Sequence, residues 1–185
     1  MSTTGFRMRR AHSALLVVDV QQRLAPAIED GRNVLAHCVW LMRLAERLGV
    51  PTVATEHCPD KIGHSVEAIL EAAAGVQVVS KRMFSAVADG CLADTAVQVR
   101  EDVIVCGTET HVCVQQTALD LALAGKRVFV VADAVGSRRA LDRDLAIERM
   151  RAHGIDVVTR EMVAFEWLES GDDPLFGEIN REFLR

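Results

Sequence analysis

Six short apolar runs recur along this chain of 185 residues, and longer segments with helical spacing separate them. Continuous apolar runs are typical of strands buried on both faces, and a helix between successive strands favours parallel pairing with right-handed crossovers. We therefore expect an α/β fold in which helices cover both faces of a six-stranded parallel sheet. The predicted strands are residues 13–19, 52–56, 76–81, 102–107, 127–132 and 155–158.

The segments between these runs repeat apolar residues at intervals of three and four, the spacing of an amphipathic helix. Glycines follow three of the segments and are expected to end the helices, because glycine readily adopts the left-handed backbone of a C-terminal cap. The predicted helices are residues 33–48, 65–74, 92–100, 111–124 and 139–152, followed by a loop and helix at 159–168 and a tail at 174–184.

Length, charge and cysteine content narrow the class of protein. The length fits one domain, so we expect residues 1–185 to form a single domain. A net charge of -5, with a single short basic run at Arg7, Arg9 and Arg10, argues against a nucleic-acid partner. No apolar run approaches the ~18 residues of a membrane span, so we expect no membrane partner. The five cysteines include no C-x-x-C pair, which favours free thiols and a cytoplasmic location.

Polar residues follow the predicted strands, at the edge of a parallel sheet where ligands usually bind. The first strand ends at Asp19, the second at Glu56 and His57, and the third at Lys81. The fourth leads through residues 107–113 into a helix. We thus expect three groups to meet where the strands end: an acid, a lysine, and a cysteine at the start of a helix.

Cys113 is the candidate nucleophile in this group. If Thr110 is the N-cap, Cys113 is the third residue of the helix, where backbone N–H groups lack helical partners and the helix dipole favours negative charge. Both effects are expected to lower the pKa of the thiol, and the free N–H groups could receive an oxyanion. The alternative is a small buried apolar residue, the usual fate of a free cysteine.

Asp19 and Lys81 have two interpretations each. A carboxylate at Asp19 could take the thiol proton and pass it to a leaving group, or it could serve as a cap or salt-bridge partner. An ammonium at Lys81 would stabilise a thiolate, or its side chain could extend to solvent.

Four segments together resemble the isochorismatase-like hydrolases: LLVVDVQ at 15–21, SKRMFSA at 80–86, CGTETHVCVQQTALDLALAG at 106–125 and VVADAVGSR at 130–138. The resemblance extends from about residue 14 to residue 176. It implies a Rossmann-like three-layer fold and a catalytic triad of Asp19, Lys81 and Cys113. In related enzymes the cysteine attacks a carboxamide, a thioester forms as the amine leaves, and water then hydrolyses the thioester.

The resemblance also implies an oxyanion hole made by the backbone N–H groups of Glu109 and Cys113. A cis peptide bond usually precedes the first of these groups, which here would be the bond between Thr108 and Glu109. Such a bond costs roughly 3–4 kcal/mol, so function and packing must hold it.

Three branches of the family differ in their chemistry. True isochorismatases lack the nucleophile, so Cys113 argues against that reaction. Nicotinamidases bind a metal through an Asp-x-His…His pattern, from which the segment at 55–65 (TEHCPDKIGHS) departs. We therefore expect no metal and no cofactor, although Glu56, His57 and His64 could still approach an ion.

The segment at 55–65 looks closer to a third branch, whose members mostly have no assigned substrate. In that branch Glu56, His57, Phe84 and His111 are expected to line the pocket for a small-molecule substrate, although Phe84 could equally belong to the core. We expect an amidohydrolase that acts on a small amide or related C–N bond.

Two other hypotheses remain to be weighed. A non-catalytic binding or interaction protein could keep the fold, with Lys81 or Asp19 turned away from Cys113. A nucleotide-binding Rossmann protein is excluded, because the first strand continues into Val20, Gln21 and Gln22 without a glycine-rich turn.

The family commonly forms homo-oligomers, and we expect a dimer or tetramer. Apolar residues near the C-terminus could form a subunit contact or could cover the chain's own sheet; they are Phe165, Trp167, Leu168 and Phe176.

Overall fold

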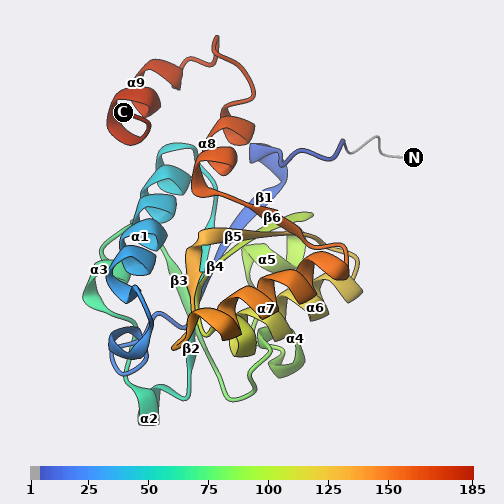
Figure 1. Ribbon diagram of the computed structural model, residues 1–185. Coiled ribbons are helices and arrows are strands. Elements are labelled where there is room, and N and C mark those ends of the chain that lie inside the picture. The colour runs from blue at the N-terminus through green and yellow to red at the C-terminus, as the bar shows by residue number, and fades with distance from the viewer. Residues whose placement is uncertain (1–4) are drawn as a thin grey trace.

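The computed structural model describes residues 5–185, so residues 1–4 of the predicted domain lie outside the described residues. It contains the expected six-stranded sheet, in the order β3-β2-β1-β4-β5-β6 with every strand pair parallel (Figure 1). The strands are β1 (Ser13–Val18), β2 (Thr52–His57), β3 (Gln77–Lys81), β4 (Asp102–Thr108), β5 (Arg127–Gly136) and β6 (Asp156–Val158). This order changes direction between β1 and β4, which is where open α/β sheets bind ligands.

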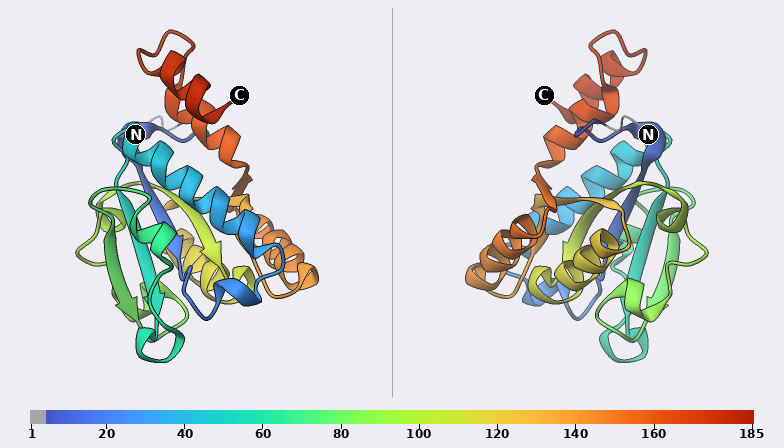
Figure 2. Two further views of the ribbon diagram at one scale, coloured as in Figure 1. Left: turned by 90° about the vertical axis from the view of Figure 1, so that its left-hand side faces the viewer. Right: turned by 90° about the vertical axis from the view of Figure 1, so that its right-hand side faces the viewer.

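Helices cover both faces of the sheet, as expected (Figure 2). Neighbouring side chains of β1 enter opposite cores: Leu15 and Val17 pack on one face, and Leu16 and Val18 on the other. The first core lies under α1 (Gly31–Arg47), α3 (Glu67–Leu70), α8 (Arg160–Leu168) and α9 (Phe176–Phe183). The second lies under α4 (Ala86–Asp89), α5 (Ala96–Val99), α6 (Gln115–Leu123) and α7 (Ala140–Ala152).

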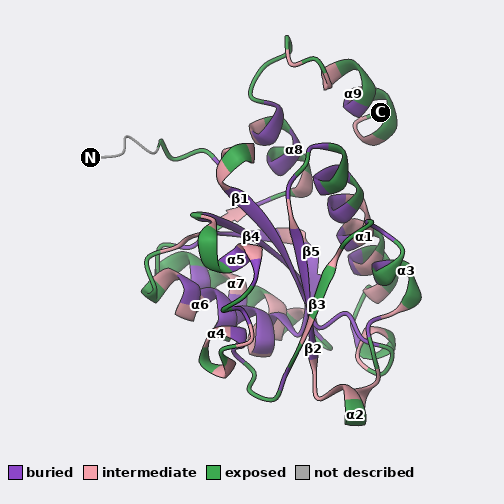
Figure 3. Ribbon diagram, turned by 180° about the vertical axis from the view of Figure 1, so that it is seen from behind, coloured by how far each residue is buried: buried purple, intermediate pink, exposed green. Residues whose placement is uncertain are grey.

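The central strands explain why the apolar runs are continuous. Every residue of β1 and of β4 is buried, whereas β3, at the edge of the sheet, exposes most of its residues (Figure 3). The exception in β3 is its last residue, Lys81, which is buried. A charged side chain buried at the end of an exposed edge strand indicates a specific partner inside.

Several predicted elements differ in length from those observed. The helix expected at 92–100 is only α5, because the Thr95 hydroxyl bonds the carbonyl of Leu92 and closes a separate turn before it. The helix expected at 65–74 shortens to α3. Strand β5 runs on to Gly136, because an irregularity in its pairing with β4 lets Val135 pair with Gly107.

The tail expected at 174–184 contains a helix, α9, which lies beyond α8 at one end of the molecule (Figure 1). Its residues Phe176 and Phe183 pack against the core, and the Phe183 ring meets Trp40 of α1 edge-on at 5.4 Å. Trp167 and Leu168 of α8 are buried in the same core. Trp167, Leu168 and Phe176 therefore cover the chain's own fold, whereas Phe165 is half exposed. Other short helical segments are η1 (Arg10–His12), η2 (Ala25–Ala27) and α2 (Pro59–Ile62).

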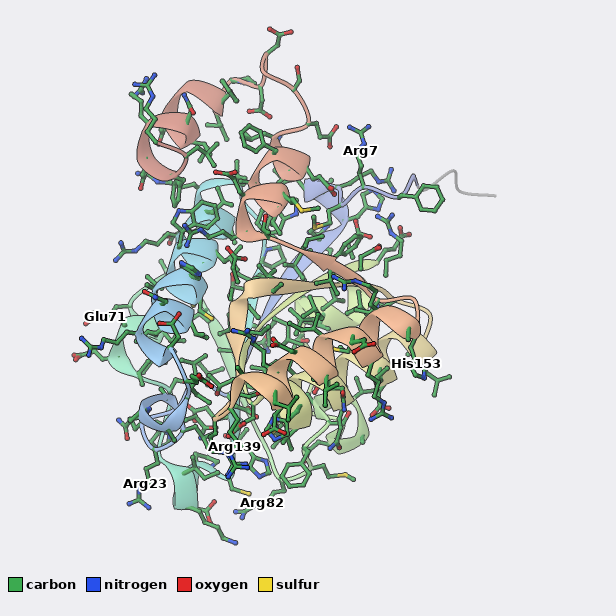
Figure 4. The ribbon with its side chains drawn as sticks, in the orientation of Figure 1. Arg7, Arg23, Glu71, Arg82, Arg139 and His153 are labelled. Carbon is green, nitrogen blue, oxygen red and sulfur yellow. The ribbon has the colours of Figure 1, made fainter. Side chains whose placement is uncertain are left out.

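The carboxyl ends of β1, β3 and β5 lie at one end of the molecule. Arg23, Arg82 and Arg139, which follow β1, β3 and β5, lie at the same end of the molecule (Figure 4).

Among residues 5–185, no helix has both the length and the apolar character that a membrane crossing requires.

Candidate active site

Asp19 follows β1 directly and is completely buried. Its backbone is left-handed, with φ at 50°, which is uncommon for a residue other than glycine. Both neighbouring strands hold it there: the Thr55 hydroxyl donates to its carboxylate at 2.6 Å, and the Thr108 hydroxyl donates to its carbonyl at 2.6 Å. Backbone held in this region by its surroundings is a feature of functional sites.

Lys81, the last residue of the outermost strand β3, extends its side chain to Asp19. Its Nζ lies 2.7 Å from Oδ2 of Asp19, and both side chains are inaccessible to solvent. The ammonium also donates to the carbonyls of Met83 at 3.3 Å and Phe84 at 3.0 Å, so all three of its protons have acceptors. The side chain therefore does not extend to solvent, and a buried ion pair is formed.

Cys113 lies beside this pair in a π-helical turn, Thr110–Val114, that leads into α6. Such turns are frequent at functional sites. The thiol is buried, and the charges of both Asp19 and Lys81 affect its pKa. The structure thus brings together the three side chains proposed from the sequence.

The expected lowering of the Cys113 pKa is wrong. Burial, and next the carboxylate of Asp19, raise the pKa of the thiol to about 12, and Lys81 offsets only part of this. Thr110 is not a cap either, since its buried hydroxyl has no hydrogen-bond partner among the described residues. The resting thiol is therefore protonated at neutral pH, and a thiolate forms only if a base takes the proton.

This protonated state predicts how alkylation depends on pH. We expect the rate at which iodoacetamide labels Cys113, followed by peptide mass mapping, to rise close to tenfold per pH unit between pH 7 and 9.5, because the thiolate is the reacting species. A rate that levels off near pH 7 would contradict the raised pKa. The Cys113→Ala variant gives the background for the peptide.

The expected cis bond between Thr108 and Glu109 is also wrong, since residues 5–185 contain only trans peptide bonds. Instead, two residues at the end of β4 have a positive φ: Gly107, inside the strand, with φ at 122°, and Glu109, directly after it, with φ at 41°. A side chain at Gly107 would place its Cβ 2.2 Å from the carbonyl oxygen of Val18, so only glycine lets β4 approach β1 so closely.

The residues expected to line the pocket divide into two groups. Glu56 is buried and holds the loop after β2, because its carboxylate accepts the Ser65 N–H at 2.7 Å and pairs with His64 Nδ1 at 2.9 Å. Burial raises its pKa, but these bonds outweigh burial and leave the pKa below its usual value. Such a carboxylate is occupied within the protein, and its role as a substrate contact stays a prediction.

His57 and Phe84 lie nearer the surface beside the triad. Their rings are 5.2 Å apart, and Phe84 is half exposed, so it is not simply a core residue. Burial, and next the charge of Lys81, lower the pKa of His57. His111 contacts the Ser137 hydroxyl at 3.0 Å on the other side of the Cys113 turn. Among residues 5–185, no three His, Cys, Asp or Glu side chains gather closely enough to hold a metal ion.

The supporting roles of three residues were not identified from the sequence. Thr55 and Thr108 hold Asp19, as described above. Gln21 is fully buried and bonds the backbone of His57 in both directions, at 2.8 and 3.0 Å. The available signal for Gln21 was its place shortly after a strand predicted to be buried, because a polar side chain in the interior usually has a fixed partner.

Comparisons with known proteins agree with this architecture. The family of the isochorismatase domain matches residues 13–162. Isochorismatase domain-containing protein 1 of zebrafish (Danio rerio) is 35% identical over 178 residues, which cover 96% of this chain and 62% of the zebrafish protein. The chain thus spans less than two thirds of the length of that relative.

Solved structures show the same fold. A structure titled MAR1 ribonuclease from Caenorhabditis elegans has a TM-score of 0.91 and 33% identity, covering 97% of this chain and 93% of that one. YcaC from Pseudomonas aeruginosa, described with covalent acrylamide, has a TM-score of 0.87 and 27% identity, covering 99% and 94%. The domain match, the curated relative and the shared fold together show that the chain belongs to the isochorismatase family of hydrolases.

Proposed function

We propose that the protein is a cysteine hydrolase that cleaves a small amide or a related C–N bond through a thioester on Cys113. The observation that carries the proposal is the buried pair of Asp19 and Lys81, 2.7 Å apart and close enough to the Cys113 thiol for both charges to affect its pKa. Buried ion pairs contribute little net stability, so a function explains the presence of this pair better than a contribution to stability does.

In the proposed reaction, Asp19 accepts the thiol proton as the sulfur attacks the carbonyl carbon. Lys81 stabilises the thiolate that forms, and the N–H groups of Glu109 and Cys113 receive the oxyanion. Asp19 then gives its proton to the departing amine. A water molecule attacks the thioester, with Asp19 again as the base, and free thiol and carboxylic acid result.

A small substrate would bind beside the triad, between two groups of side chains. His57 and Phe84, with their rings 5.2 Å apart, form one group, and Glu109 and His111, at the start of the Cys113 turn, form the other. We propose that these side chains, with Glu56 holding the loop behind His57, contact the part of the substrate that does not react.

A screen of small primary amides for ammonia release tests the proposal. We expect turnover of at least one amide by the wild-type protein and none by Cys113→Ala. Turnover that persists in the variant would overturn the nucleophile. RNA belongs in the same screen, because one similar structure is titled a ribonuclease. The net charge of -5 does not favour a polyanionic substrate for this chain.

We also propose that the protein forms a homo-oligomer, a dimer or tetramer. Helix α7 exposes Leu141 and Leu145, which are one turn apart and are 67% and 55% accessible. Exposed apolar patches mark contact surfaces. We expect light scattering after gel filtration to give a multiple of 20.3 kDa, and the double variant Leu141→Arg/Leu145→Arg to shift the mass toward the monomer. A monomeric wild-type protein would contradict this.

A further inference from the structure

We propose that Arg138 is a positioning residue for the oxyanion hole: it holds the side chain of Glu109 and thereby fixes the direction of the Glu109 backbone N–H. The inference rests on the proposed function, because it concerns the oxyanion that attack by Cys113 would generate. Arg138 follows β5, whereas the three triad residues come from the ends of β1 and β3 and from the turn after β4.

Glu109 is an unusual residue for its place. Its backbone is left-handed, with φ at 41° and ψ at 78°, in a region that residues with a Cβ rarely occupy. Its side chain is only 8% exposed, so a carboxylate is buried directly beside the proposed oxyanion. Both features are costly and persist only if neighbouring groups hold them.

Arg138 is the group that holds Glu109. Its Nε lies 2.7 Å from Oε1 of Glu109. Among residues 5–185, the other side chain within ion-pair distance is His111, at 3.5 Å from Oε2, and that oxygen has no hydrogen-bond partner. His111 Nδ1 instead contacts the Ser137 hydroxyl at 3.0 Å. The neutralisation of Glu109 thus depends mainly on one guanidinium.

The sheet brings this arginine to its position. Gly136, the last residue of β5, pairs with Thr108, the last residue of β4. Arg138 therefore follows β5 by two residues, just as Glu109 directly follows β4. Thr108 in turn bonds the carbonyl of Asp19. One continuous chain of contacts runs from Arg138 through the turn to the proposed base.

Loss of the arginine would leave a buried carboxylate without its cation. Two consequences follow, and both weaken the oxyanion hole. The negative charge of Glu109 would oppose the charge that develops on the substrate oxygen. The carboxylate would also be drawn toward water, and its movement would turn the left-handed backbone whose N–H is needed.

Acetaldehyde labelled with ¹³C at its carbonyl carbon tests this without a known substrate. The sulfur of Cys113 bonds to the carbonyl carbon, the C=O double bond becomes a C–O single bond, and the thiol proton ends on that oxygen. The product is a thiohemiacetal whose oxygen occupies the place of the oxyanion. Its ¹³C signal gives the dissociation constant of the adduct, and Cys113→Ala is the blank.

We expect Arg138→Gln to raise this dissociation constant at least tenfold, and Arg138→Lys, which keeps the charge, to recover part of the loss. The double variant Arg138→Gln/Glu109→Gln should bind more tightly than Arg138→Gln alone, since the unpaired charge is gone. Arg139→Gln, which removes a neighbouring exposed arginine, is the matched control and should stay within twofold of wild type. Circular dichroism checks that each variant is folded.

The outcomes separate the two claims. Equal affinities in wild type and Arg138→Gln would overturn the role of Arg138 and leave the hydrolase intact. The same loss in the Glu109→Gln background would also overturn it, because Arg138 would then act without Glu109. A wild-type protein that forms no adduct dependent on Cys113 would overturn the proposed hydrolase and this inference together.

Discussion

Cys113→Ala is expected to lower kcat/KM at least about 10³-fold on any amide that the wild-type protein turns over, because removal of a nucleophile leaves only binding and electrostatic catalysis. The structure gives a reason to expect Cys113→Ser to be nearly as poor. Burial and Asp19 hold the pKa of the thiol at about 12, and a hydroxyl is a weaker acid still. Asp19 would then have to remove a far less acidic proton.

The initial rate of ammonia release, measured over a range of amide concentrations, gives kcat/KM. Cys58→Ser is the matched control, because Cys58 is another free cysteine that lies in a partly exposed loop position. It should retain full activity. If Cys113→Ala and Cys58→Ser lose activity equally, the chemistry does not depend on the thiol beside the ion pair.

Lys81→Met is expected to abolish turnover and also to destabilise the fold by about 3–5 kcal/mol, because it leaves the Asp19 carboxylate buried without its cation. Methionine fills a similar volume, so the loss of charge dominates the change. Asp19 retains the hydroxyl of Thr55, but one neutral hydrogen bond does not replace an ammonium. Urea unfolding at constant m-value measures the destabilisation.

Two variants make this prediction specific. The double variant Asp19→Asn/Lys81→Met removes both charges and should be more stable than Lys81→Met alone, although it remains inactive. Lys61→Met makes the same substitution at an exposed lysine and should change stability by less than about 0.5 kcal/mol. Equal destabilisation by the two lysine substitutions would contradict the importance of the buried pair.

The sheet could be predicted from the sequence because its signal is local. A strand buried on both faces needs an unbroken apolar run, and β1 and β4 each supply one. The same logic placed Asp19, Lys81 and Cys113 at one edge, since each ends or follows a strand. Helix α9 was missed although Phe176, Ile179 and Phe183 have helical spacing, because the helix depends on packing against Trp40, far away in the sequence.

The environment of each side chain could not be predicted in this way. The pKa of Cys113 follows from how deeply the π-helical turn buries it, and an N-cap pattern at Thr110 carries no information on depth. The partners of Glu56 come from a loop that returns to it eight and nine residues later. Neither arrangement leaves a periodic pattern in the sequence, because both depend on tertiary contacts.

The position of Lys81 at the margin of the sheet has a consequence for how the protein loses activity. Strand β3 is bonded to a single neighbour, and its first four residues are poorly covered. Edge strands open at a lower free-energy cost than the middle of a sheet. Fraying of this one strand would withdraw the ammonium from the interior while β1 and β4 stayed paired, so inactivation should begin before the fold as a whole gives way.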